Sequence, residues 1–208
     1  MINQSVQPTL VDPIHFTDYN RNKIQLEAAI LFCILAAGKA ALPAARALDR
    51  LLANARLHLF SNEESPFSLL YLVGYSQLAL LMQHSGIGCY NRKSQTIFKL
   101  IDSDLDIKTC TTTELERIYG IGPKTSRFFI VHTRPNQRLA VLDRHILNFL
   151  REHGHTVPNS TPTNAKKYRK LEDLALWYAD KAKMSPADWD LYIWNQYRRK
   201  ETRELQGV

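Results

Sequence analysis

The sequence predicts an all-α fold, and three observations support that class. Apolar residues recur at helical spacing, several segments begin with residues that cap helices, and no convincing pair of strands is found. The composition is that of a globular protein, because 45% of the 208 residues are hydrophobic and 23% are charged. Wholesale disorder is therefore excluded. Three scattered cysteines are too few for a disulfide framework or for a four-cysteine metal site.

In the first half of the chain, residues 1–20 read as a lead-in segment, and helices follow. Asn20 or Asn22 can cap a first helix that runs to about Ala37, where Gly38-Lys39 interrupts the pattern. A second helix presents regularly spaced apolar residues on one face. Three more helices are expected to begin at Ser65-Pro66, Ser76 and Lys93.

The second half begins with two overlapping capping boxes, Thr111 with Glu114 and Thr113 with Glu116. One of them starts a short helix that ends at Tyr119-Gly120. The later helices are expected over four further stretches: Pro123 to about His132, Val141–Arg151, 165–183 and 186–200. Residues 152–164 are expected to form a loop.

The formal net charge is +7, and all of the excess lies beyond residue 85. The first 85 residues carry six basic and six acidic side chains, whereas the remainder carries 21 and 14. This distribution fits either a solvated basic surface or a surface that binds a polyanion. The longest apolar stretch, Leu26–Leu42, contains Glu27 and Lys39 and is too short to span a bilayer. With no signal peptide expected either, we predict a soluble, cytoplasmic protein that does not act at a membrane.

One motif inside the basic part points to function. The segment LERIYGIGPKTS, residues 115–126, reads as helix, tight turn and helix, with Ile121 between Gly120 and Gly122. Glycines allow positive φ and leave backbone N–H groups accessible. At the start of the next helix, such N–H groups form a site for a phosphate. The motif favours DNA binding over a plain helical connection with a glycine cap.

A second segment, LAVLDRHI, residues 139–146, places Asp143 at the start of a helix, 19 residues after Lys124. Together the two segments resemble the helix–hairpin–helix–GPD superfamily of base-excision DNA glycosylases, which includes endonuclease III and 8-oxoguanine DNA glycosylase. The resemblance spans about Asn22 to Arg151 and includes, more weakly, residues 32–39 and 86–93. The iron–sulfur cysteines of endonuclease III are missing, so that cluster is not expected. No other metal or cofactor is expected, and a cation bound by carbonyl groups of the hairpin stays an open alternative.

The resemblance implies a bifunctional glycosylase and AP lyase. Lys124 is then the nucleophile that attacks C1′ of an extruded nucleotide and forms a Schiff base, after which β-elimination cuts the strand. A free lysine has a pKa of about 10.4, and we expect Arg127 and the positive end of the helix to favour the neutral amine of Lys124. Asp143 stays ionised and stabilises the positive charge that grows on the sugar. By themselves, Asp143 is also a plausible N-cap and Lys124 a plausible surface lysine.

Further contacts are expected from the hairpin, the flanking loops and the last helix. The expected DNA-binding residues are Gly120, Gly122, Thr125, His145, Lys39 and Tyr90, and those of the base pocket are Phe128, Asp190 and Trp194. Asp190 can accept N–H groups of a purine edge while Trp194 stacks on the base. The alternatives are a core or capping role for His145, a core role for Phe128 and Trp194, and plain surface positions for Lys39 and Tyr90.

We expect two helical lobes with a DNA-binding cleft between them. Residues 40–140 form one lobe, with the helix–hairpin–helix at about 114–132, and residues 21–39 and 141–208 form the other. The expected partner is double-stranded DNA with a damaged base, most simply 8-oxoguanine, bound by a monomer. Other hypotheses keep the chemistry but change the base to an oxidised pyrimidine or a base of modified foreign DNA, or replace the enzyme by a non-catalytic DNA-binding module. Metal-dependent nuclease action is disfavoured, because Asp102, Asp104 and Asp106 read as a solvated loop.

Overall fold

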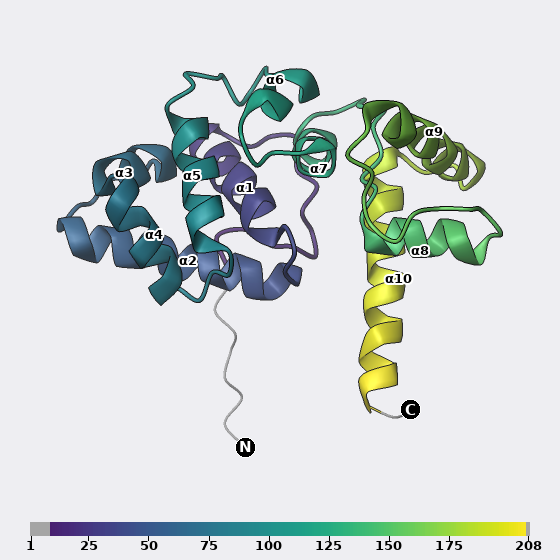
Figure 1. Ribbon diagram of the computed structural model, residues 1–208, viewed down its shortest axis with the longest axis horizontal. Helices are drawn as coiled ribbons and strands as arrows, with labels where there is room; N and C mark the ends of the chain where they lie inside the picture. Colours follow the sequence, from purple (N-terminus) through teal and green to yellow (C-terminus); the bar gives the residue numbers. More distant parts are fainter. Residues whose placement is uncertain (1–8, 207–208) are drawn as a thin grey trace. The chain divides into compact units, whose positions relative to one another are not determined.

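The computed structural model describes residues 9–206, with side chains described as far as Arg198. Residues 1–8 of the expected lead-in segment lie outside the described residues. The described part is all-helical, which confirms the fold class (Figure 1). Its helices are α1 Lys23–Ala36, α2 Ala41–Leu59, α3 Pro66–Val73, α4 Tyr75–His84, α5 Tyr90–Ile101, α6 Thr112–Arg117, α7 Pro123–Thr133, α8 Arg144–Glu152, α9 Ala165–Lys181 and α10 Pro186–Gln206. None of them is long and apolar enough to cross a bilayer.

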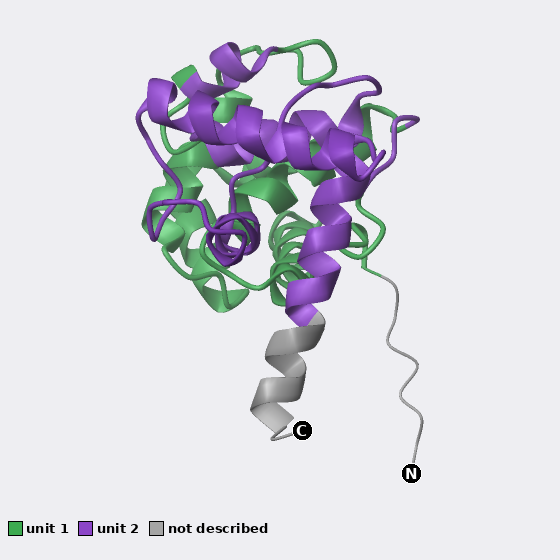
Figure 2. Cartoon of the chain, turned by 90° about the vertical axis from the view of Figure 1, so that its right-hand side faces the viewer, with its two compact units in different colours: residues 1–16, 21–110, 117–121 green, residues 17–20, 111–116, 122–208 purple. Residues whose placement is uncertain are grey.

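The chain divides into two compact units, coloured separately in Figure 2. Unit 1 takes in 21–110 and 117–121 with the segment up to Phe16, and unit 2 takes in 17–20, 111–116 and the chain from Gly122 onward. This division differs from the expected lobes at three helices. Helix α1 belongs with α2, α3 and α5 in unit 1 rather than with the C-terminal helices, while α7 and all of α6 except Arg117 belong to unit 2.

Unit 1 is built around α1, and the composition of that helix explains why. Every residue from Leu26 to Leu35 is buried, which is the behaviour of a helix that is apolar on all sides. Its one buried acid, Glu27, accepts hydrogen bonds from Ser65 Oγ at 2.6 Å and from Phe67 N at 3.1 Å. Such a helix needs covering on every face, which its neighbours in unit 1 provide.

Unit 2 packs α8, α9 and α10 around one apolar core. The buried members of that core are Ala140, Leu142, Ile146, Leu150, Tyr168, Ala175, Leu176, Ala179, Trp189 and Ile193. The Tyr168 hydroxyl donates to Ala140 O at 2.9 Å and accepts from Leu142 N at 3.1 Å. Burial raises the pKa of Tyr168, so this hydroxyl remains a donor.

These bonds correct one expected boundary. A helix was expected to begin at Val141, but α8 begins at Arg144, because side chains of α9 occupy the backbone groups just before it. Besides the two bonds of Tyr168, Ala140 N donates to Glu172 Oε1 at 3.1 Å. The segment that leads to Asp143 is therefore fixed by α9.

Candidate active site

The two glycines of the hairpin have different reasons to be glycine. Gly120 has φ +87°, and a Cβ added there would lie 2.0 Å from Thr96 Oγ1, so both backbone and space require glycine. Gly122 has φ −102°, and an added Cβ would meet no atom within 4 Å. Of the two hairpin glycines, Gly120 is therefore the one that adopts the positive φ that glycine allows. Gly122 instead has open space beside it.

The start of α7 presents free N–H groups. Pro123 has no N–H, and Ser126 N is the first to bond back into the helix, to Gly122 O at 3.1 Å. The N–H groups of Lys124 and Thr125 therefore lack an intrahelical acceptor, and no side chain caps the helix. This end of α7 offers positive potential and donors to an anion.

Lys124, in the first turn of α7, is half-buried. Its ammonium makes no hydrogen bond or ion pair with any of the residues that the structure describes. A lysine without a protein partner at this position can act on a bound ligand, because no competing salt bridge has to break first.

Arg127, one turn further along α7, has its charge balanced within the fold. Its Nε donates to Glu172 Oε1 at 2.7 Å and its Nη1 to Glu116 Oε1 at 2.6 Å, while the guanidinium lies 4.4 Å from the ring centroid of Tyr168. The expectation that Arg127 acts on Lys124 as a free neighbouring cation is therefore wrong. Two carboxylates compensate its charge, and its contacts join α6, α7 and α9.

Asp143 is the N-cap of α8. Its Oδ1 accepts from His145 N and from Ile146 N, both at 2.9 Å. Among the described residues, Oδ2 has no hydrogen-bond partner. The N-cap expected of Asp143 is thus confirmed, and its other oxygen remains available, so the catalytic role stays a prediction.

Asp190 is a buried acid that interacts with the groups described above. The residue is 7% exposed, and its Oδ2 lies 3.0 Å from Nε2 of the fully buried His132. Burial raises the pKa of Asp190, while the hydrogen bond and charge of His132 oppose the rise; Asp143 raises it and Lys124 lowers it through their charges. Lys124 and Asp143 therefore each lie within electrostatic reach of Asp190 inside unit 2.

The other expected base-pocket residues lie partly within the packing. Phe128 is half-buried, and its ring meets that of His132 edge-on at 5.1 Å between centroids. Trp194 is also half-buried, with the Arg198 guanidinium 5.0 Å from its ring centroid. Both side chains pack against neighbouring residues and are also partly exposed to solvent. The base-pocket role and the core role therefore both remain open for them.

The expected DNA-binding residues are scattered. His145 is 4% exposed and packs against the Tyr197 ring at 5.9 Å, which favours its core alternative over a phosphate contact. Thr125 is buried too. In unit 1, the ammonium of Lys39 donates to Gly86 O, and Tyr90 begins α5 half-buried.

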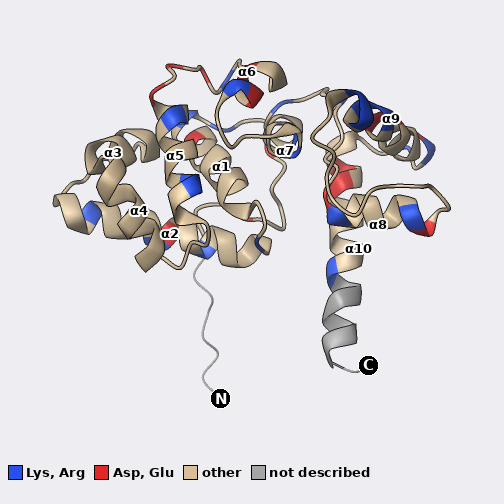
Figure 3. Cartoon of the chain, in the orientation of Figure 1, with Lys and Arg blue, Asp and Glu red and all other residues tan. Residues whose placement is uncertain are grey.

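Positive charge gathers on part of unit 2. The first two turns of α9 carry exposed Lys166, Lys167, Arg169 and Lys170, which appear blue in Figure 3. Four cations at a helix N-terminus oppose the helix dipole, so they are not there to stabilise α9. They provide a surface that attracts a polyanion.

Sequence reasoning missed the side chains that support this site. His132, Glu116 and Glu172 bond to partners that lie 58, 11 and 45 residues away in the chain. No local pattern links such pairs. The nearest available signal is a charged residue on the apolar face of a helix, as at Glu172.

Within the described part of the chain, no group of three or more His, Cys, Asp or Glu residues is placed to hold a metal ion.

Comparison with known proteins bears on this geometry. A family model described as 8-oxoguanine DNA glycosylase matches residues 14–184. Among curated proteins, the 8-oxoguanine DNA glycosylase/AP lyases of Thermotoga petrophila and Thermotoga maritima are each 32% identical over 75 residues. That match covers 36% of this chain and 36% of each relative.

Two solved structures share the fold. The 8-oxoguanine DNA glycosylase of Thermotoga maritima superposes with a TM-score of 0.64 at 22% identity, over 83% of this chain and 79% of that one. The Methanocaldococcus jannaschii 8-oxoguanine glycosylase/lyase, in complex with 15mer DNA containing 8-oxoguanine, gives 0.63 at 19% identity, over 86% and 84%.

Proposed function

Because the chain belongs to the 8-oxoguanine DNA glycosylase family, we propose that it is a bifunctional DNA glycosylase and AP lyase that excises 8-oxoguanine from double-stranded DNA. The observation that supports the proposal is that an unpaired Lys124 and the carboxylate of Asp143 both lie within electrostatic reach of Asp190 in unit 2. The names of the curated relatives, and the lesion DNA bound to the M. jannaschii enzyme, support the choice of substrate.

The proposed reaction begins with the neutral amine of Lys124. Its lone pair attacks C1′ of the extruded nucleotide, the bond from C1′ to the base breaks, and the base leaves with that electron pair and takes up a proton. Loss of the amine proton and ring opening give a Schiff base between Lys124 and the sugar. Removal of a C2′ proton then expels the 3′ phosphate, which cuts the strand.

The fixed orientation of Asp143 supports the role proposed for it. Its Oδ1 is held by two backbone N–H groups of α8, which fixes the orientation of the carboxylate. The available Oδ2 then faces the positive charge that develops on the sugar ring. A fixed carboxylate costs no reorganisation during the reaction.

The duplex itself is held by contacts that do not read sequence. The N–H groups at the start of α7 and the open space beside Gly122 suit the approach of a phosphate. The basic turns of α9 add a general attraction for the backbone. Asp190 is proposed to bind the extruded base, together with Phe128, whose ring packs against His132, and Trp194, four residues further along α10.

A trapping assay tests the proposal. The protein is incubated with duplexes that carry 8-oxoguanine, thymine glycol, uracil, an abasic site or guanine, and borohydride reduces any Schiff base to a stable covalent complex. We expect trapping with the 8-oxoguanine and abasic duplexes and none with guanine. Trapping with thymine glycol instead would change the substrate, and binding without any trapping would leave only a DNA-binding module.

A further inference from the structure

A chain of three side chains runs through unit 2 to Asp190. Thr17 Oγ1 lies 2.8 Å from His132 Nδ1, and His132 Nε2 lies 3.0 Å from Asp190 Oδ2. The backbone joins at the same point, because Asp18 N donates to His132 O at 3.0 Å. His132 is completely buried, so both of its ring nitrogens are assigned to fixed partners.

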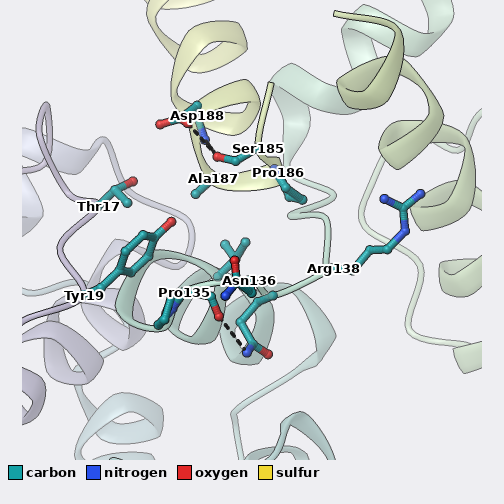
Figure 4. A pocket seen from close by; sticks show the side chains of 11 residues that line it. Thr17, Tyr19, Pro135, Asn136, Arg138, Ser185, Pro186, Ala187 and Asp188 are labelled. Atoms are coloured by element: carbon teal, nitrogen blue, oxygen red, sulfur yellow. Dashed lines mark hydrogen bonds between the residues drawn. The ribbon is translucent and has the colours of Figure 1, made fainter. Parts of the chain in front are cut away.

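The outer end of this chain reaches a pocket. Thr17, Tyr19, Ser185 and Asp188 line a cavity of about 500 Å³ in unit 2, at the start of α10 (Figure 4). The Ser185 hydroxyl bonds to Asp188 Oδ2 at 2.6 Å there. The Thr17 end of the chain therefore borders solvent, whereas the Asp190 end is enclosed with the active-site charges.

His132 offsets the cost of burying Asp190. A buried carboxyl favours its protonated form, and a hydrogen bond to the ionised form opposes that preference. The charged and titratable groups that act on Asp190 are His132 and Lys124 on α7 and Asp143 at the cap of α8, and Asp190 in turn acts on Tyr168 of α9. Of these, the imidazole of His132 is the one in direct hydrogen-bond contact.

One oxygen of the Asp190 carboxyl group remains available to a ligand. The side chain's hydrogen bond to the described residues uses Oδ2, which leaves Oδ1 to accept from a ligand. An ionised carboxylate with Oδ2 already engaged is a pure acceptor at Oδ1. A proton on Oδ1 of Asp190 would present a donor in place of an acceptor to an N–H group of the base.

We propose that His132, fixed by Thr17, is a positioning residue that holds Asp190 ionised and oriented to accept N–H groups of the damaged base, an inference that rests on the proposed function. His132 does not touch the base. It acts on the choice of base through Asp190, and it is not needed for chemistry at the sugar.

The test separates base excision from lyase chemistry. His132→Leu removes the hydrogen bond, whereas His132→Gln keeps an N–H donor and is the matched control. For each variant, single-turnover release of 8-oxoguanine is compared with borohydride trapping on a duplex that already carries an abasic site. Such a duplex has no base to recognise, so trapping on it does not depend on Asp190.

We expect His132→Leu to slow 8-oxoguanine release by about 10- to 100-fold near neutral pH, the worth of one hydrogen bond to a charged group. Trapping on the abasic duplex should stay within about twofold, and His132→Gln should retain most of the release rate. Because loss of the donor raises the pKa of Asp190, the acidic limb of the release profile should move to higher pH, and alkaline buffer should restore part of the rate.

Two further measurements test the role of Thr17 and the pKa of Asp190. Thr17→Val leaves His132 in place and should shift the release profile in the same direction by less, with Thr17→Ser as its control. The pKa of Asp190, followed by carbon NMR of the free protein, should rise in His132→Leu whatever the substrate is. A parallel loss of release and abasic trapping, or an unchanged Asp190 pKa, would overturn the inference, whereas wild-type protein that traps no duplex would instead overturn the proposed function.

Discussion

Arg127 and Glu172 form a buried ion pair at 2.7 Å that joins the second hairpin helix to α9. Arg127 also binds Glu116 of α6 at 2.6 Å, and Glu172 accepts Ala140 N at 3.1 Å. The pair thus fixes both the helix that carries Lys124 and the segment that leads to Asp143. The ion pair therefore holds the Lys124 helix and the segment before Asp143 together within unit 2.

The first prediction concerns the stability that this pair provides. Arg127→Leu leaves two carboxylates with no cation between them, and we expect a loss of about 3–5 kcal/mol in the free energy of unfolding. Denaturant unfolding monitored by circular dichroism measures it. Arg138→Leu, which breaks the exposed pair with Asp180, is the control and should cost far less, because solvent screens an exposed pair. Equal losses in the two variants would contradict the role given to Arg127.

The two hairpin glycines should separate folding from DNA binding. Gly120→Ala places a Cβ against Thr96 at a residue with positive φ, so it should cost at least about 1–2 kcal/mol of stability. Gly122→Ala meets open space and should change stability by no more than about 0.5 kcal/mol.

DNA binding should depend more on Gly122 than on Gly120. The added methyl group at Gly122 blocks the approach of a phosphate to the N–H groups of α7, and we expect affinity for an abasic-analogue duplex to fall about tenfold. Fluorescence anisotropy at one fixed salt concentration measures it, because affinity for DNA depends steeply on salt. Unchanged affinity in Gly122→Ala would remove the hairpin from the DNA contacts.

Asp143 should show that its two oxygens have separate roles. Asparagine caps helices as well as aspartate does, so Asp143→Asn should keep the stability of α8 but lose the negative charge. We expect turnover to fall by about 10²–10³-fold with affinity for lesion DNA retained. Asp143→Ala should lose the same activity and in addition about 0.5–2 kcal/mol of stability. An Asp143→Asn variant that excises at the wild-type rate would limit Asp143 to helix capping.

Local signals in the sequence were enough to place most helices. Asn22 forms the capping box at the start of α1, and Ser65 with Pro66 starts α3 as expected. Of the two overlapping boxes, Thr111 with Glu114 is the one that forms. Such signals act within one turn of helix, which is why they can be read without knowledge of the fold.

Features that depend on distant residues could not be predicted. Residues 141–143 have an apolar, helix-compatible sequence, but Tyr168 and Glu172 occupy the neighbouring backbone groups and hold them outside α8. The assignment of α1 to unit 1 depends on which helices cover it. The bond between His132 and Asp190 joins residues 58 positions apart, and neither helix carries a local pattern that indicates it. The candidate catalytic pair, in contrast, follows from motif and spacing and remains a prediction.

The central claim is that the amine of Lys124 forms the covalent bond to the sugar, and borohydride trapping with Lys124→Gln tests it most directly. Glutamine is close in size and has no nucleophilic amine, so we expect no covalent complex with 8-oxoguanine or abasic duplexes, while anisotropy still reports lesion binding. In the wild-type complex, peptide mapping should find the reduced sugar on Lys124. A Lys124→Gln variant that traps as well as wild type, or a sugar mapped to another amine, would contradict the claim.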